Sequence, residues 1–371
     1  MDEDPFSGLG LRPVELADRA VLTSHFASLA QPLSDYTFSQ LYTWRNSLKI
    51  LWKMIRGHLC VFANGTGDLT LLMPPIGDTG SDAALAEAFE LMDTYNGRRG
   101  VLDRSRVEYV SDELLSRLEP SNLSTKSMGA DYVYDVNSMI DLAGGDLASK
   151  RQAKNRFMRN YRYRVEPYVA AAHRDGCLAL LDHWKIHQDA QHLEESNANS
   201  VKRSKESIAT ALCLDTAEEL GLKGMVVYVE AGEDSGFGNP AILAFTFGEY
   251  LGVEQSSITI EKTDLSVKGL AQFIFSEFCR QNWSDRPLVN VGDDWGLESL
   301  AWTKQSYRPV KLLNKYVLRK VPAVISGPTI APAEAQPVRS LMPLPEPIIR
   351  PARAGRSNNR SAFAASRDPF D

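Results

Sequence analysis

Hydrophobic and polar residues follow two periods along the first 320 positions. Apolar residues three and four positions apart predict helices, whereas short apolar runs bounded by turn-forming residues predict strands. In the first half these patterns predict two helices, three strands, a helix, a strand and a short helix at residues 14–29, 37–48, 50–55, 59–63, 69–73, 82–95, 106–110 and 112–118. This mixture is typical of an α/β or α+β fold.

The second half repeats this order with a longer pair of helices at its start. The predicted elements are helices 175–189 and 199–220, strands 225–230, 241–249 and 257–261, helix 268–281, strand 288–291, helix 297–305 and a final strand pair within 310–319. Leu270, Phe273, Ile274 and Phe278 share one face of helix 268–281, as in a helix that packs on a sheet. We therefore predict a duplicated unit, with mixed sheets flanked by helices.

The domain boundaries follow from this repeat and from a change in composition near the C-terminus. We predict one domain at 1–145 and a second at 146–320. Residues 321–371 contain nine prolines and no sustained hydrophobic period. Such a segment buries too little surface to offset its ordering entropy, so we predict a disordered tail. Docking of this tail on a protein partner is the alternative.

Composition narrows the function classes. The chain carries a net charge of -6, and the tail is positive, so the first 320 residues form an acidic body. An acidic body is not typical of a general nucleic-acid binder, and any phosphate contact must be local. The four cysteines are far apart, which favours neither zinc nor disulfides. The sequence has no apolar run of membrane-spanning length and no signal-peptide pattern, so we expect a soluble, cytoplasmic protein.

Candidate chemistry concentrates between residues 258 and 307. A strand leads through a short loop into a helix that starts near Lys268 and Gly269, where backbone N–H groups and a cation favour an anion. The next strand ends near Asn290, Asp293 and Asp294, at the strand end where α/β sheets usually bind ligands. The two aspartates either position a nucleophile or cap the next helix. Tyr307 follows that helix as a proton donor or a core residue.

A second candidate is the basic segment 147–164, which has seven Lys and Arg residues and no acid. Read as a helix, it presents hydrogen-bond donors one turn apart, a spacing that suits the phosphates of a tRNA, a coenzyme or a lipid head group. Its candidate donor-binding residues are Lys150, Arg151, Asn155 and Arg156. A solvated helix that joins the two domains is the competing interpretation.

Several other active sites lack sequence support. His183 and His187 have a metal-compatible spacing, but the HExxH glutamate is missing, so we predict no metal. The hydrolase motif GxSxG and the phosphate-loop motif GxxxxGK[ST] are also absent. In the first half, Pro74 and Pro75 stand where a phosphate loop needs N–H donors. We therefore expect the first domain to be a degenerate copy and the second the active one.

Six segments in order resemble the C-terminal domain of phosphatidylglycerol lysyltransferase. They are SDYTFSQLYTWR from Ser34, DYVYD from Asp131, KRxxxNRFxxxY from Lys150, AFTFGE from Ala244, IEKTD from Ile260, and NxxDDxG from Asn290 followed by KxSYRP from Lys304. The resemblance implies two tandem GNAT-type acyltransferase folds and transfer of an aminoacyl group from aminoacyl-tRNA. Lipid-modifying members also carry a membrane domain, which this sequence lacks, so phosphatidylglycerol is not the expected acceptor. The acceptor stays open between a small molecule, a peptide and a lipid head group.

These features lead to one leading hypothesis and two alternatives. An amine or hydroxyl attacks an activated ester or thioester held between strands 257–261 and 288–291. The predicted residues on the acceptor side are Glu206, Glu249 and Asn290. The cosubstrate is aminoacyl-tRNA or acyl-CoA, with no tightly bound cofactor. Ser266 departs from the Arg or Gln that begins the usual acetyltransferase loop. The alternatives are an acetyl-CoA-dependent N-acetyltransferase and a non-catalytic binding module.

Overall fold

The computed structural model describes residues 6–30, 32–78, 80–118, 122–191, 197–230 and 241–321. The predicted tail lies outside the described residues, except for Val321. The elements of the first half are η1 (Ser7–Leu9), β1 (Arg12–Pro13), η2 (Leu16–Asp18), α1 (Arg19–Phe26), α2 (Phe38–Leu48), β2 (Ile50–Ile55), β3 (His58–Ala63), β4 (Thr70–Leu71), α3 (Ser81–Arg98), η3 (Leu102–Arg104), β5 (Val107–Ser111), α4 (Asp112–Ser116), β6 (Leu123–Asp135) and α5 (Val136–Asp141). Those of the second half are α6 (Ala148–Asn160), β7 (Tyr163–Pro167), α7 (Ala170–Gln191), α8 (Asn197–Thr216), β8 (Lys223–Val229), β9 (Ala241–Tyr250), β10 (Gln255–Thr263), α9 (Leu270–Asn282), β11 (Leu288–Asn290), α10 (Glu298–Ser306) and β12 (Lys311–Lys320).

The strands form one mixed sheet in the order β1-β2-β3-β4-β5-β12-β6-β11-β10-β9-β8-β7. In each half, the first four strands pair antiparallel and the fourth pairs parallel with the fifth. The sixth strand of each half pairs with the fifth strand of the other half. These two exchanged strands, β6 and β12, also pair with each other at the centre of the sheet. The predicted boundary at 145/146 falls between α5 and α6 and stays a prediction.

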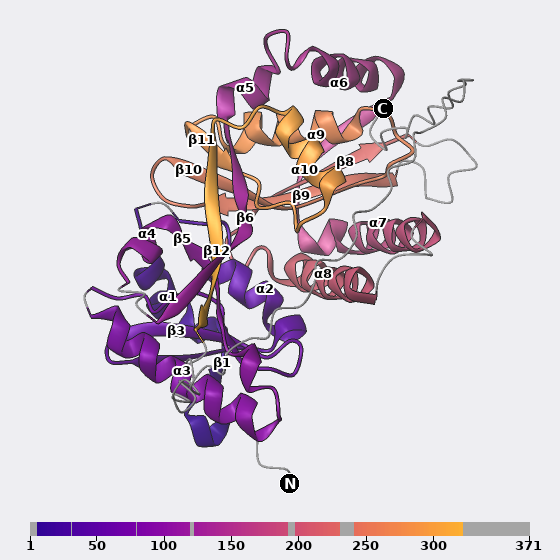
Figure 1. The fold of residues 1–371 in the computed structure, drawn as a ribbon. Coiled ribbons are helices and arrows are strands. Elements are labelled where there is room, and N and C mark those ends of the chain that lie inside the picture. Colours follow the sequence, from indigo (N-terminus) through magenta and orange to yellow (C-terminus); the bar gives the residue numbers. More distant parts are fainter. Residues whose placement is uncertain are drawn as a thin grey trace, which may run out of the picture. The chain divides into compact units, whose positions relative to one another are not determined.

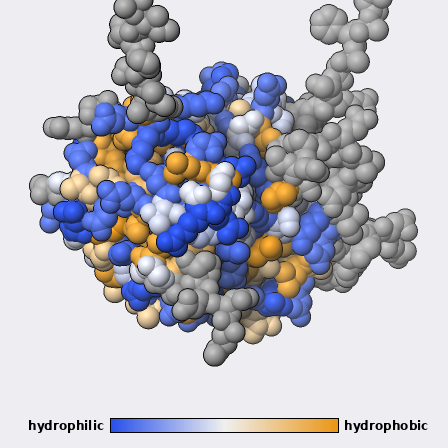
Figure 2. Space-filling view, turned by 60° about the horizontal axis from the view of Figure 1, so that its bottom comes forward, coloured by the Kyte–Doolittle hydropathy of each residue, from blue (hydrophilic) through white to orange (hydrophobic). Residues whose placement is uncertain are grey.

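Helices cover both faces of the sheet because the side chains of its strands alternate between two apolar surfaces. In β8, Met225 and Val227 join the core beneath α9 and α6, whereas Val226 joins the core beneath α7 and α8. Figure 1 shows these two pairs of helices on opposite sides of β8, β9 and β10. On the face drawn in Figure 2, hydrophilic residues separate the exposed hydrophobic patches. No helix in the described part of the chain is long and apolar enough to cross a membrane.

Several sequence predictions differ from the structure. The predicted helix 14–29 is shorter, because Leu16–Asp18 form η2 and α1 spans only Arg19–Phe26. The predicted strand pair within 310–319 is one strand, β12, because its edges pair with β5 and β6. The predicted basic helix 147–164 ends earlier, at Asn160 in α6. The chain becomes extended at Tyr161 and then enters β7, which pairs with β8. The basic residues after position 160 therefore lie in a loop and a strand rather than on the helix face.

Candidate functional site

The two parallel strands β10 and β11 separate in the middle of the second half. They pair only from Gln255 to Ser257 with Leu288 to Asn290, and β10 continues to Thr263 with β9 as its neighbour. A bulge between Ile258 and Ile260 bends β10 at this point. The unpaired edge of β10 leaves backbone groups that a substrate can meet. This gap is where the sequence hypothesis placed the reacting ester.

Glu261 lies on the part of β10 that has separated from β11. Its Oε2 atom is buried and has no hydrogen-bond partner among the residues described. Burial raises the pKa of the Glu261 carboxyl to about 8, although the positive charge of Lys304 opposes this shift. A carboxylate without a partner is costly in a folded protein, so this position is unusual for a structural residue.

Tyr307 closes α10 and packs its ring beside the same gap. The ring centroid lies 6.1 Å from that of Tyr134 and 5.3 Å from that of Phe275, and the residue is buried. Burial raises the pKa of the Tyr307 hydroxyl, and the negative charge of Glu261 raises it further. Tyr307 therefore carries its proton at neutral pH, as an ordinary tyrosine does.

Lys304, one turn before Tyr307, holds the loop that follows β11. Its Nζ donates to the carbonyl oxygens of Val291, Gly292 and Asp293 at 2.7, 3.2 and 2.5 Å. Burial lowers the pKa of Lys304 to about 8, while the charge of Asp293 opposes the shift. Trp295 in this loop has a φ of 55°, a left-handed conformation that is uncommon outside glycine. The loop is thus tightly held in an unusual conformation.

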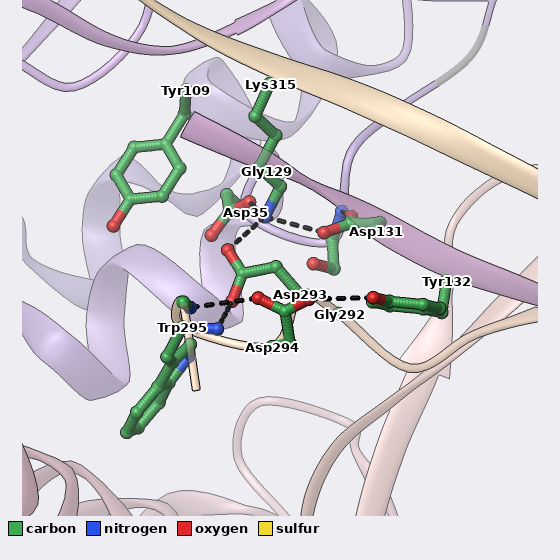
Figure 3. A network of polar contacts seen from close by, with 12 residues as sticks. Asp35, Tyr109, Gly129, Asp131, Tyr132, Gly292, Asp293, Asp294, Trp295 and Lys315 are labelled. Atoms are coloured by element: carbon green, nitrogen blue, oxygen red, sulfur yellow. Dashed lines mark hydrogen bonds and ion pairs between the residues drawn. The ribbon is translucent and has the colours of Figure 1, made fainter. Parts of the chain in front are cut away.

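The predicted catalytic residue Asp293 belongs to a buried ion-pair network (Figure 3). Lys315 of β12 points into this network, and its Nζ lies 2.5 Å from Asp35, 2.6 Å from Asp131 and 3.0 Å from Asp293. The Lys315 side chain is only 1% exposed. Burial raises the pKa of Asp35 to about 6, whereas Lys315 and hydrogen bonds hold that of Asp131 below its usual value against the effect of burial. Asp293 therefore contacts a fixed cation that the sequence reasoning did not identify.

The predicted residues Asn290 and Asp294 extend the same network. Asn290 donates to Asp131 at 2.9 Å and accepts from the Gly292 amide at 2.8 Å. Asp294 accepts from the Tyr132 hydroxyl at 2.7 Å and from the Gly296 amide at 2.9 Å. The structure thus brings Asn290, Asp293 and Asp294 together and gives each of them protein partners.

The start of α9 is crowded by the chain itself. Gly269 has a φ of +86°, and a Cβ built on it would lie 2.1 Å from the Ala153 carbonyl oxygen of α6. In the structure, the backbone of α6 therefore makes the close approach that glycine permits. Asp264 accepts hydrogen bonds from the amide and hydroxyl of Ser266 in the same loop, at 2.8 and 2.6 Å. Lys268 is exposed on this loop.

The four donor-binding candidates on α6 fall into two groups. Lys150 is buried, and its Nζ lies 5.0 Å from the ring centroid of Tyr307. Arg151 donates to the carbonyl oxygens of Leu142 and Gly144, which follow α5. These two residues therefore have structural contacts within the fold. Asn155 and Arg156 are exposed.

The two acidic residues predicted on the acceptor side have separate partners. Glu206 of α8 accepts from Lys262 of β10 at 2.7 Å. Glu249 of β9 accepts from the hydroxyl of Ser39 in α2, and burial raises its pKa. Because Lys262 and Glu261 are neighbours on β10, their side chains point to opposite faces of the sheet. Glu206 is thus on the face opposite to Glu261.

A cavity of about 460 Å³ opens beside Tyr307. It lies between the segment that joins α5 to α6 and the segment that joins α10 to β12, and its lining includes Asp135, Ser138, Gly144, Asp146, Tyr307 and Arg308. Among the described residues no group of His, Cys, Asp and Glu forms a metal site. The four cysteines are buried thiols.

Sequence reasoning missed four charged residues of this site, namely Asp35, Asp131, Glu261 and Lys315. Three of them stood inside segments already singled out, because Asp35 lies in SDYTF, Asp131 in DYVYD and Glu261 in IEKTD. The charged residues of these segments could therefore have been named as candidate site residues from the sequence. Lys315 had no signal, since a lysine in an alternating strand usually faces solvent.

The single mixed sheet, its helices on both faces and its separating parallel strands define a GNAT-like α/β fold. Residues 26–319 match the family described as phosphatidylglycerol lysyltransferase, C-terminal. The chain belongs to this family, as its sequence segments predicted.

Solved structures agree with this assignment. A conserved protein of unknown function from Bacteroides thetaiotaomicron is 25% identical with a TM-score of 0.69, covering 83% of this chain and 98% of its own. L-PGS from Bacillus licheniformis is 14% identical with a TM-score of 0.55, covering 83% and 93%. The C-terminal domain of a putative lysylphosphatidylglycerol synthetase from Agrobacterium fabrum is 15% identical with a TM-score of 0.51, covering 82% and 92%. No curated protein matches this chain.

Proposed function

We propose that this protein transfers an aminoacyl group from an aminoacyl-tRNA to an amine or hydroxyl acceptor. The observation that carries the proposal is the buried Tyr307 beside the gap between β10 and β11, in a chain of the lysyltransferase family. The ester carbonyl enters this gap, where backbone N–H groups stabilise the developing oxyanion. Tyr307 then protonates the departing ribose oxygen of the tRNA.

The charged residues around the gap have distinct roles in this proposal. Lys304 and Lys315 hold the loop with Asp293 and Asp294 in one conformation, so that the two aspartates position the acceptor. The exposed Asn155 and Arg156 of α6, with Lys268, contact phosphates of the donor. The cavity beside Tyr307 admits the acceptor. The crowded start of α9 disfavours an acyl-CoA donor, because Asp264 occupies the loop where a coenzyme phosphate would bind.

The test is a transfer assay with the purified protein and a pool of radiolabelled aminoacyl-tRNAs, beginning with lysyl-tRNA because the family description names lysyl transfer. We expect label to move to an amine or alcohol acceptor. Tyr307→Phe keeps the ring packing and removes the proton donor, so we expect kcat to fall by about 10²-fold or more with KM little changed. Tyr161→Phe, which removes the hydroxyl of a partly buried tyrosine packed against the same core, is the matched control.

Coenzyme A thioesters in the same assay test the alternative donor. Transfer from a thioester but from no aminoacyl-tRNA would contradict the proposal and support an N-acetyltransferase. Transfer from neither donor would support the binding-module alternative. Neutralising Arg156 should weaken tRNA binding and reduce its salt dependence, since one phosphate contact is lost.

A further inference from the structure

Glu261 is a buried acidic residue with an oxygen that no described group satisfies. It lies on the separated part of β10, and its Oε2 atom is buried without a hydrogen-bond partner among the described residues. Its neighbour Lys262 is also buried, but its charge has partners in the fold. Lys262 pairs with Glu206, and its Nζ lies 3.8 Å from the ring centroid of Trp184. An unpartnered carboxylate oxygen in a folded core is expensive and calls for a reason.

The groups that face Glu261 come from two helices on the same side of the sheet. Burial raises the pKa of Glu261, and the charge of Lys304 of α10 opposes this shift. Burial also raises the pKa values of Tyr307, after α10, and of Cys279 in α9, and the ionised form of Glu261 raises both further. Cys279 is a buried thiol, so it does not supply a charge at neutral pH. Glu261, a candidate proton acceptor, therefore acts electrostatically on Tyr307, a proton donor, beside the gap that we assign to the ester.

We propose that Glu261 is the general base of the transfer reaction, a catalytic role that rests on the function proposed above. The acceptor nitrogen or oxygen attacks the ester carbonyl and gives its proton to Oε2 of Glu261. The new bond to carbon forms as the bond to the ribose oxygen breaks, and this oxygen takes the proton of Tyr307. Proton transfer from Glu261 to Tyr307 then restores both groups, so atoms and charges balance.

This assignment separates the base from the aspartates of the loop. Asp293 is paired with Lys315, and Asp294 accepts a hydrogen bond from Tyr132. The carboxylates of both aspartates therefore already have protein partners. A base must have a lone pair that no protein group occupies. Oε2 of Glu261 has no hydrogen-bond partner among the described residues, whereas Asp293 has Lys315 at one oxygen and the Trp295 amide at the other. The pKa of Glu261, raised by burial to about 8, is also near the working pH of a base.

The experiment compares wild type with Glu261→Gln, Glu261→Asp and the matched control Glu254→Gln. Glu254 is exposed just before β10 and lies outside the site. We expect Glu261→Gln to lower kcat by about 10²- to 10³-fold with KM within about twofold, and Glu261→Asp to recover part of it. In wild type, kcat should rise with pH toward a plateau above about 8, and this limb should be lost in Glu261→Gln. Glu254→Gln should match wild type.

A second readout does not depend on activity. The pKa of Glu261 is higher in the folded protein than in the unfolded chain, so ionisation of this group lowers stability as pH rises from about 4.5 to about 8. The urea midpoint of Glu261→Gln should therefore exceed that of wild type, by a difference that grows between pH 5 and pH 9. Equal pH dependence in both proteins would overturn the inference.

The outcomes distinguish this inference from the proposed function. If wild type is active and Glu261→Gln keeps its rate and pH profile, Glu261 is not the base and the proposed function stands. If wild type transfers no aminoacyl group to any acceptor, the proposed function fails and this inference fails with it.

Discussion

At the scale of single residues, the site contains a buried cluster in which carboxylates outnumber the cation that they contact. One lysine, Lys315, faces three carboxylates from three separate segments of the chain. The lysine cannot neutralise all three, and burial makes the excess negative charge costly. The raised pKa of Asp35, to about 6, expresses this cost. We infer that Asp35 is the member of the network that takes up a proton most easily.

Asp35→Asn should stabilise the protein above pH 6. The folded pKa of Asp35 exceeds its unfolded value, so its ionisation lowers stability as pH rises from about 4 to about 6. Asparagine does not ionise, so the variant does not lose stability in this way. Its free energy of unfolding should exceed that of wild type by on the order of 1–3 kcal/mol at pH 7.5. Urea unfolding at pH 4.5, 5.5 and 7.5 measures the difference, which should grow with pH. Asp175→Asn, at a side chain 97% exposed, is the control.

The charged network could be predicted only in part. Strands and helices with clear apolar periods were predicted close to their observed bounds, as for α9. The contacts of Lys315 could not be predicted, because Asp35 and Asp131 are distant from it in the sequence. The pairing of β12 with β6 brings Lys315 to this part of the first half. A buried ion pair has no local signature in a sequence, since the same residue types are common on surfaces.

At the scale of elements, β6 shows why one long strand escaped prediction. Its first residues are mostly polar and largely exposed, and only its last ones are consistently buried. Hydrophobic alternation is therefore weak over most of its length, and its partner β12 lies at the other end of the chain. The predicted strand 288–291, by contrast, contains buried residues that mark it locally.

The contact between α6 and α9 gives a prediction at this scale. In Gly269→Ala, the new Cβ would meet the Ala153 carbonyl oxygen at 2.1 Å, so α6 must move. We expect a loss of roughly 3 kcal/mol or more in the free energy of unfolding. Gly144 has the same φ of +86°, with nothing within 4 Å of a built Cβ, so Gly144→Ala isolates the backbone cost of about 1–2 kcal/mol. Equal losses in both variants, measured by urea unfolding, would show that α6 does not press on Gly269.

At the scale of the whole molecule, the exchanged strands join the two halves of the described chain. β12 pairs with β5 and β6 of the first half, and β6 pairs with β11 of the second. The network around Lys315 lies at this junction and draws Asp35 and Asp131 from the first half and Asp293 from the second. The site next to β11 therefore depends on residues of both halves, including the half that the sequence marked as degenerate.

Because each half holds a strand of the other, we expect residues 1–145 and 146–371 to fold only together. Expressed alone, residues 146–371 would lack β6, which leaves β11 and β12 with unpaired edges. We expect this fragment to aggregate or stay unfolded, whereas the two fragments produced together should copurify and show the circular dichroism of the intact chain. The intact chain should unfold in one transition that near-ultraviolet and far-ultraviolet signals follow alike. A fragment 146–371 that is soluble and unfolds cooperatively by itself would show that the strand exchange is dispensable.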